Sequence, residues 1–228
     1  STQARKLNAI ASGALPNGKP IVVNADGTVS VVNETSATEA TGTAVTFEGA
    51  QSYYISSAYD STNSRVVISY RDQGDSNRGK VAVGVVSGSS ITFGTPVQFS
   101  SGIIVETAVT FDSSNGKVVV FYSDYNGSSY TGKALVGTVS GTTISFGSSS
   151  NFSSSRAIDP SAIYDPQNEK VIVAYKDAGN SDYGTAIVGT VSGTSISFGS
   201  AVVFESAEVT SCSVAYDDNS QKVVIAYR

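Results

Sequence analysis

Aspartate residues recur along the chain at the spacing of a repeat, and they are the first candidates for chemistry. Two carboxylates can hydrolyse a glycosidic bond when one donates a proton and the other acts as base or nucleophile. A catalytic pair needs two residues in different environments, whereas each of these aspartates opens a predicted hairpin turn and can bond local backbone groups there. We therefore interpret these aspartates as turn residues. They are Asp60, Asp112, Asp165 and Asp217.

A second set of aspartates opens three polar loops, each directly after a predicted strand. Carboxylate, amide and aromatic side chains together suit a hydroxyl-rich ligand or a partner surface. Structural turns are the alternative interpretation, and calcium is less favoured because the loops lack regularly alternating carboxylates. The candidate ligand-binding residues are Asp72, Asp75, Asp124, Asn126, Tyr130, Asp177, Asn180, Asp182 and Tyr183.

The composition excludes several classes of site. The chain has no His, which excludes Ser-His-Asp and Cys-His catalysis and histidine metal sites. The single cysteine, Cys212, cannot form an intrachain disulfide, and we expect a small buried residue in a strand. No glycine-rich phosphate loop is present. We therefore predict a protein that is not an enzyme and that uses no cofactor and no metal.

The charge and hydropathy exclude further partners. A net charge of −5 argues against nucleic acid and against an anionic membrane surface. No apolar run approaches the roughly 18 residues that a membrane span needs. The chain lacks methionine even at position 1, so we expect it to be processed or part of something longer. Weak glycosylation sequons begin at Asn33, Asn126 and Asn151.

The strongest feature of the sequence is an internal repeat of about 52 residues, which occurs three times in full and once in part. Aromatic residues, glycines and Ser-Gly turns recur in phase, as a repeat architecture requires. The clearest columns are Tyr59, Phe111, Tyr164 and Tyr216; Tyr70, Tyr122, Tyr175 and Tyr227; Gly79, Gly132 and Gly184; and Phe47, Phe99, Phe152 and Phe204.

Each unit reads as four short strands separated by turns. In the third unit we predict strands at 161–164, 170–175 and 184–191, and a fourth that starts at 195–198 and continues towards Phe204. The second and third strands are apolar at both odd and even positions. Because an antiparallel sheet usually exposes one face to water, this pattern predicts sheets covered on both faces by neighbours.

Four-stranded units stacked face to face are typical of a β-propeller, and this is the fold that we predict. A β-solenoid and a string of small sandwiches are the alternatives. The chain stops after the second strand of a fourth unit, and residues 42–47 match the tail of a unit. A ring of four blades closes if the two ends share one blade; otherwise the chain is cut from a longer array.

Residues 1–40 lie outside the repeat domain, which spans 41–228. We predict a β-hairpin at 21–32, with its turn at Asn24-Ala25-Asp26-Gly27. This N-terminal arm either pairs into the last blade or anchors the protein elsewhere.

Four charged residues break the repeat near the predicted first strands, which commonly line the channel of a propeller. They either mark a site or are solvated rim residues, and the second interpretation is favoured. They are Glu106, Arg156, Asp159 and Glu208. A carbohydrate-active enzyme that uses an unrepeated carboxylate such as Asp159 or Glu208 is the least favoured functional hypothesis.

The repeat segments IYDPQNEKVIVAYKD and GTAIVGTVSGTSISFGS, and the lead-in ASGALPNGKPIVVNADGTVSVV, resemble mostly uncharacterised proteins of marine and freshwater tailed bacteriophages. The resemblance implies a virion or tail-associated component, such as a tail fibre or a decoration that attaches to a host surface. It carries no catalytic residues.

These observations predict a non-enzymatic structural or adhesive protein of a virion, filament or other extracellular assembly. Rigid blades would present polar loops to other copies, to virion proteins or to surface glycans. A lectin that binds one sugar per blade through the loops is the alternative.

Overall fold

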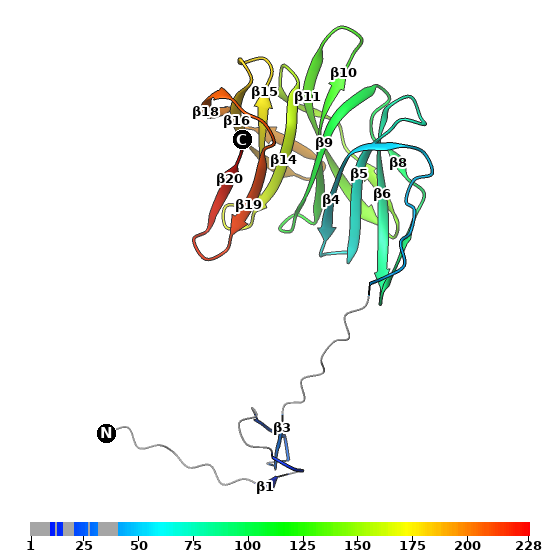
Figure 1. Cartoon of the computed structure of the whole chain (residues 1–228), viewed down its shortest axis with the longest axis vertical. Coiled ribbons are helices and arrows are strands. Elements are labelled where there is room, and N and C mark those ends of the chain that lie inside the picture. Colours follow the sequence, from blue (N-terminus) through cyan, green and yellow to red (C-terminus); the bar gives the residue numbers. More distant parts are fainter. Residues whose placement is uncertain (1–9, 12, 16–20, 27, 32–40) are drawn as a thin grey trace, which may run out of the picture. The chain divides into compact units, whose positions relative to one another are not determined.

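The computed structural model describes residues 10–11, 13–15, 21–26, 28–31 and 41–228 (Figure 1). The chain divides into two compact units, residues 1–41 and 42–228. The described part of the first unit is a small sheet in which β3 (Thr28–Val31) pairs in parallel with β1 (Ile10–Ala11) and antiparallel with β2 (Ile21–Val23). The predicted hairpin is therefore present, although Gly27 and Val32 lie outside the described residues.

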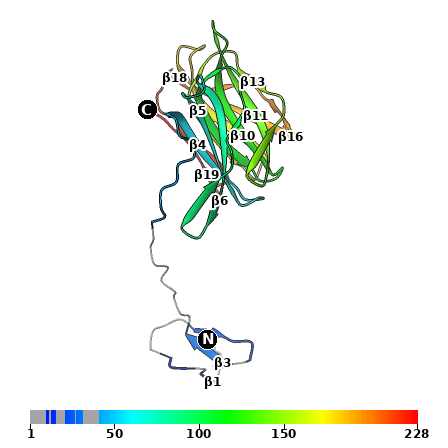
Figure 2. The same cartoon turned by 90° about the vertical axis from the view of Figure 1, so that its right-hand side faces the viewer.

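The second unit consists of three five-stranded sheets and one two-stranded sheet, all antiparallel (Figure 2). We call them sheets one to four in chain order. Sheet one contains β4 (Ser52–Asp60), β5 (Arg65–Asp72), β6 (Arg78–Ser87), β7 (Ser90–Phe93) and β8 (Val97–Gln98); sheet two contains β9 (Ile103–Asp112), β10 (Lys117–Tyr125), β11 (Tyr130–Ser140), β12 (Thr143–Phe146) and β13 (Ser150–Ser153). Sheet three contains β14 (Ala157–Asp165), β15 (Lys170–Asp177), β16 (Tyr183–Ser192), β17 (Ser195–Phe198) and β18 (Val202–Glu208); sheet four contains β19 (Ser213–Asp217) and β20 (Lys222–Ala226).

The first three sheets share one topology, which confirms the all-β repeat. Four strands follow one another in space as in the sequence, and a fifth short strand pairs with the third strand beside the fourth. The expectation of one continuous fourth strand is wrong. The chain leaves the sheet at Gly199, and β18 returns to the other half of the same edge of β16.

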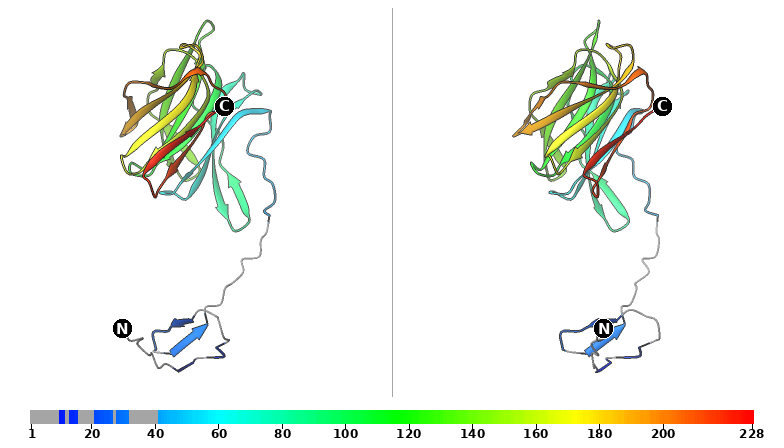
Figure 3. Two further views of the ribbon diagram at one scale, coloured as in Figure 1. Left: turned by 60° about the vertical axis from the view of Figure 1, so that its left-hand side comes forward. Right: turned by 90° about the vertical axis from the view of Figure 1, so that its left-hand side faces the viewer.

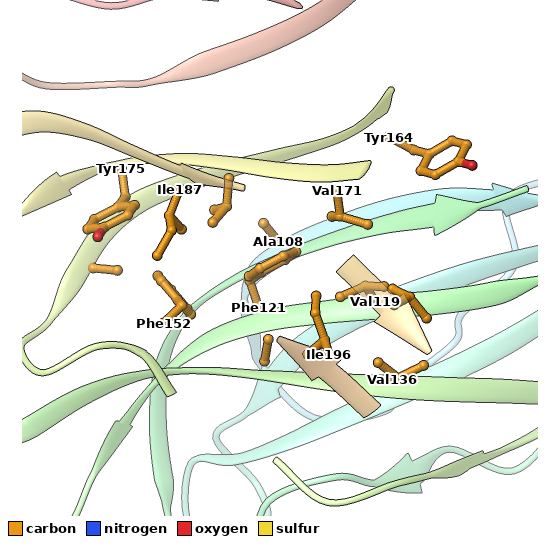
Figure 4. Close-up of a cluster of buried hydrophobic side chains, with 14 residues drawn as sticks. Ala108, Val119, Phe121, Val136, Phe152, Tyr164, Val171, Tyr175, Ile187 and Ile196 are labelled. Atoms are coloured by element: carbon orange, nitrogen blue, oxygen red, sulfur yellow. The ribbon is translucent and has the colours of Figure 1, made fainter. Parts of the chain in front are cut away.

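The second strands β10 and β15 are buried on both faces, as their apolar pattern predicts, whereas the third strand β16 keeps exposed residues such as Val188. One core cluster joins sheet one to sheet two through Val67, Val83 and Val120. Another joins sheet two to sheet three through Phe121, Phe152 and Ile187 (Figure 4). Each sheet therefore obtains its core from its neighbours, which is how dispersion contacts accumulate in a close-packed interior.

The first strands of the four sheets are neighbours in sequence order. β4 lies beside β9, β9 beside β14, and β14 beside β19 (Figures 1 and 3). Each first strand carries one residue in the left-handed region, with φ between 47° and 56°, in or just before the strand. In the first three sheets the register shifts at this residue, which is a β-bulge. The four residues are Tyr54, Glu106, Asp159 and Ser211.

Candidate functional site

The two ends of the repeat sheets differ in chemistry. We call the end with the loops after β5, β10 and β15 the loop end, and the end with the hairpins after β4, β9, β14 and β19 the turn end. Asp112 at the turn end accepts hydrogen bonds from the backbone N–H and side-chain amide of Asn115, at 3.0 and 2.8 Å. Equivalent bonds are made by Asp60, Asp165 and Asp217, which confirms all four as turn residues.

At the loop end, the predicted aspartates are engaged within their own sheets. Asp72 accepts a hydrogen bond from the N–H of Gly74 at 2.8 Å and pairs with Lys80 at 2.7 Å. Burial opposes ionisation of Asp72, but the Lys80 ammonium and the backbone N–H groups outweigh it and lower the pKa of its carboxyl. Asp124 pairs in the same way with Lys133, at 2.6 Å. These carboxylates shape loops and are not free acceptors.

The remaining predicted loop residues have related roles. Asp177 accepts hydrogen bonds from Ser155 at 2.7 Å and from the N–H of Gly179 at 2.9 Å. Asp75 and Asp182 pair with Lys80 and Lys176, at 3.2 and 3.3 Å, and the backbone of Asn180 closes the third loop. Each of the three loops is therefore held by hydrogen bonds and ion pairs that its aspartates accept.

In the second loop, Asn126 forms an Asx turn by accepting bonds from the N–H groups of Ser128 and Ser129. Asp124 and Asn126 line a cavity of about 400 Å³ together with Tyr125. Of the sequons, Asn126 and Asn151 are exposed, and Asn33 lies outside the described residues.

The residues that all four first strands bring together form a polar pocket at the loop end. This loop-end pocket has a volume of about 290 Å³. Its walls include all four residues with positive φ in or just before the first strands, so four different side chains face one cavity at equivalent repeat positions. The lining residues are Tyr54, Ile55, Glu106, Thr107, Asp159, Pro160, Ser211 and Cys212.

Glu106 is not a solvated rim residue, which corrects the favoured expectation for it. Its side chain is buried, and its Oε1 atom lies 2.5 Å from Nη2 of Arg156. Burial raises the pKa of the Glu106 carboxyl, although Arg156 and the N–H of Asp159 stabilise the charged form. Glu208, in contrast, is an exposed partner of Lys176, as expected for a rim residue.

Two clusters of tyrosine and arginine flank the loop-end pocket. On one side the Arg71 guanidinium lies 4.6 and 4.8 Å from the ring centroids of Tyr53 and Tyr54. On the other side Arg156 lies 5.3 Å from the ring centroid of Tyr130, whose ring is tilted against that of Tyr125 with the centroids 4.7 Å apart. Such contacts hold flat aromatic faces in fixed orientations next to the polar cavity.

Cys212 is half-buried and lies just before β19, not within a strand as expected. Burial raises the pKa of its thiol, and the nearby Asp159 charge adds to this effect. The thiolate is therefore disfavoured, which is the opposite of what nucleophilic catalysis requires.

Part of the loop-end pocket was not predicted from the sequence. Tyr53, Tyr54 and Arg71 received no role, although a signal existed. The column Tyr54, Glu106, Asp159 and Ser211 keeps the repeat spacing while its residue type changes in every unit. A composite site built from repeats would show this pattern, in which the spacing is kept and the residue type differs between units.

Within the described ranges, no three acidic, cysteine or histidine side chains are grouped so that they could hold a metal ion. The same ranges contain no helix with the length and apolar character to cross a membrane. Searches against protein-family models and against curated proteins find no match to this chain.

Proposed function

We propose that this protein is a non-catalytic binding and structural module of a virion or other extracellular assembly, and that it contacts its partner through the loop end. The observation that carries the proposal is the loop-end pocket. It combines residues from four repeat units with flanking Tyr–Arg clusters. The Glu106 carboxylate in its wall already forms an ion pair with Arg156. The virion location rests on the resemblance of the repeat and lead-in segments to phage proteins.

The scaffold in this proposal is a β-propeller of four blades. Two cavities support this arrangement, because each is lined by residues in or directly before or after all four first strands. The loop-end pocket is one, and the other is a cavity of about 380 Å³ at the turn end that includes Tyr59, Phe111, Tyr164 and Tyr216. First strands that surround a common line are the geometry of a propeller channel.

The state of the polar residues supports binding without turnover. A retaining or inverting glycosidase needs a carboxylic acid that is free to protonate the leaving group. Burial raises the pKa of the Glu106 carboxyl in the pocket, but its Oε1 is occupied by Arg156. The protein therefore offers a fixed polar surface and no free acid at this position.

A lectin is the second candidate, and the exposed aromatic faces favour it. The half-exposed Tyr54 ring adjoins a polar pocket whose volume suits a small ligand such as one or two sugar rings. This candidate predicts one composite site per chain in the loop-end pocket, in addition to any sites in the separate loops.

A polysaccharide panel tests the proposal when binding and release of reducing ends are measured together. Replacing Tyr54 and Tyr130 by Ala is expected to weaken binding at least about tenfold, or roughly 1.4 kcal/mol. The matched control is Tyr59→Ala, which removes an exposed tyrosine from the turn end of the same strand as Tyr54. Turnover of any polysaccharide, or an equal loss with the control, would contradict the proposal.

Electron microscopy of native material tests the assembly itself. Copies arrayed on a particle or filament would support a structural role. A protein that neither assembles nor binds any member of the panel would contradict both candidates.

A further inference from the structure

The loop end of sheet one carries an arginine whose charge has no acidic partner among the described residues. Arg71 lies near the end of β5, and its guanidinium forms no ion pair and no hydrogen bond with that part of the chain. Its Nε atom is buried, so water does not take the place of a partner at that atom. Native structures contain few buried polar atoms without a hydrogen bond. The state of Arg71 is therefore unusual and indicates a role other than holding the sheet together.

Sheet three shows how the repeat neutralises a cation at this position. Lys176 occupies the repeat position of Arg71. Its Nζ atom lies 3.3 Å from a carboxylate oxygen of Asp182 and 3.0 Å from one of Glu208. The first acid belongs to the loop after β15, and the second is the last residue of β18. Lys176 is therefore neutralised by acids of its own repeat unit.

Sheet one has uncharged residues in place of these two acids. Asn77 takes the place of Asp182 in the register of the repeat. Ile103 takes the place of Glu208. The backbone is the same at both places. The N–H of the residue after Ile103 bonds to the carbonyl of Asn77 at 3.0 Å, and the N–H of the residue after Glu208 bonds to the carbonyl of Asp182 at 3.1 Å. The fold therefore offers positions for two acids, and the sequence of sheet one does not use them.

The acids closest to Arg71 in the chain and the sheet are engaged elsewhere. The next residue, Asp72, pairs with Lys80 at 2.7 Å. Glu48 accepts a hydrogen bond from the hydroxyl of Tyr70 at 2.9 Å. Because side chains alternate along a strand, Tyr70 and Arg71 point to opposite faces of β5. The positive charge of Arg71 is therefore not cancelled within its own sheet.

Two tyrosine rings hold this guanidinium at the surface. The ring centroids of Tyr53 and Tyr54 lie 4.6 and 4.8 Å from Cζ of Arg71. The two tyrosines are 36% and 37% exposed. Cation–π contacts use the face of the guanidinium and leave its N–H donors free for an anion. Because Tyr54 also lines the loop-end pocket, the free donors of Arg71 lie at the rim of that pocket.

Other polar atoms without partners lie around the same pocket. Within the described ranges, the buried side-chain atoms that make no hydrogen bond are Ser52 Oγ, Arg71 Nε and Arg156 Nε. Ser52 directly precedes Tyr53 in β4 and stands where the next two sheets have the apolar residues Ile104 and Ala157. Its hydroxyl is therefore not required by the repeat. The polar atoms without partners are gathered at the loop end, where we propose that the ligand binds.

We propose that Arg71 binds an acidic group of the ligand, a carboxylate or sulfate ester carried on a sugar ring, and that Tyr53 and Tyr54 contact the ring itself. A guanidinium binds a planar or tetrahedral oxyanion through two parallel hydrogen bonds. Aromatic side chains beside a few polar groups are typical of sites for ring-shaped ligands. The loop end thus selects an acidic polysaccharide over a neutral one. This inference rests on the proposed binding function and adds the charge of the ligand to it.

Two matched pairs of polysaccharides test the inference. Polygalacturonate is compared with its methyl ester, and dextran sulfate with dextran, so that each pair shares a backbone and differs in charge. We expect the wild type to bind at least one charged member about tenfold or more tightly than its neutral partner. The pair that shows this preference identifies the acidic group as carboxylate or sulfate.

The same measurement separates failure of this inference from failure of the proposed function. Equal binding within both pairs, or no binding of either charged polysaccharide, would overturn the inference. A neutral member that binds through the loop end would leave the proposed binding function in place.

The variant Arg71→Gln tests the residue. It should weaken binding of the preferred charged polysaccharide about tenfold or more, while binding of the neutral partner stays nearly unchanged. Lys170→Gln is the charge-matched control, because it removes a cation from the turn end, where β15 begins. An equal loss in the control would mean that the attraction depends only on net charge and would overturn the assignment to Arg71.

A second variant gives Arg71 the compensation that Lys176 has. Ile103→Glu introduces an acid at the repeat position of Glu208, where it should pair with Arg71 and compete with the ligand. Ile103 is 43% exposed, so the substitution does not disturb a core. We expect Ile103→Glu to lose the preference for the charged polysaccharide and Ile103→Gln, which has the same shape without the charge, to keep it. Full preference in Ile103→Glu, or an equal loss in both variants, would contradict the proposal.

Discussion

Sheets two and four share a sequence pattern but differ in their surroundings. Tyr122 in sheet two is 3% exposed, whereas Tyr227 at the same repeat position is 45% exposed. Phe152 of sheet two contacts Phe121, Tyr175 and Phe198, at 5.4 to 5.9 Å, whereas the equivalent Phe204 of sheet three makes its ring contact with Tyr227, which follows sheet four, at 5.2 Å. The two sheets carry similar residues and obtain very different packing.

The difference shows that the repeat unit does not contain its own core. Sheet two is covered on both faces, and its apolar strands lose almost all contact with water. Sheet four is covered on one side by sheet three, and its side chains alternate between partly buried and exposed. Substitutions at equivalent positions should therefore have unequal effects, in proportion to the number of neighbours.

The largest expected difference concerns the phenylalanine column. Phe152→Ala should lower the free energy of unfolding by about 3–5 kcal/mol, because it leaves a cavity between two sheets. Phe204→Ala should cost about 1–2 kcal/mol, since this ring is only partly buried. Urea denaturation of both variants measures the difference. Equal losses would mean that sheet four covers Phe204 as well as sheet three covers Phe152.

A smaller difference is expected for the turn aspartates. Asp112 is fully buried and holds both the backbone and the side chain of Asn115. Its replacement by Ala should cost about 1–3 kcal/mol, because a buried donor loses its acceptor. The exposed Asp217 makes similar bonds, but water can replace them, so Asp217→Ala should have a much smaller effect. Thermal melts of the pair provide the measurement, and a reversed order would refute this explanation.

The smallest expected effect is on the pH dependence of stability. Burial opposes ionisation of Asp165, but hydrogen bonds from Asn168 and Gln167 outweigh it and lower the pKa below the ordinary 3.8. At a pH near or below about 4, the unfolded chain therefore binds more protons than the folded chain. The free energy of unfolding falls as the pH drops through this range. Asp165→Asn should flatten this decline in denaturation curves, and Asp217→Asn should flatten it less. An unchanged slope in Asp165→Asn would exclude Asp165 as a source of the decline.

Much of the fold follows from the repeat. The aromatic columns and the two-faced apolar strands predict repeated sheets that cover one another, and the structure has them, although the first three sheets have five strands where four are predicted. The break at Gly199 could not be predicted, because it depends on two short strands sharing one edge of β16. The same limit applies to the bulges, since the register shift at Glu106 arises from pairing between β9 and β10.

The candidate site could be predicted only in part. Loop composition identified polar residues, but it did not show that Asp72 and Asp124 are engaged by Lys80 and Lys133. The ion pair between Glu106 and Arg156 joins residues 50 positions apart, one in β9 of sheet two and one just before β14 of sheet three. Such a contact depends on how the sheets pack, and residue type alone does not specify it.

The stoichiometry of ligand binding tests the central claim most directly. Isothermal titration with the tightest ligand of the polysaccharide panel, in the wild type and in Arg156→Lys, would count the sites and locate them. A composite pocket formed by four sheets predicts one site per chain that is weakened by Arg156→Lys. Three equivalent sites that are insensitive to Arg156→Lys would place binding in the separate loops and contradict the account.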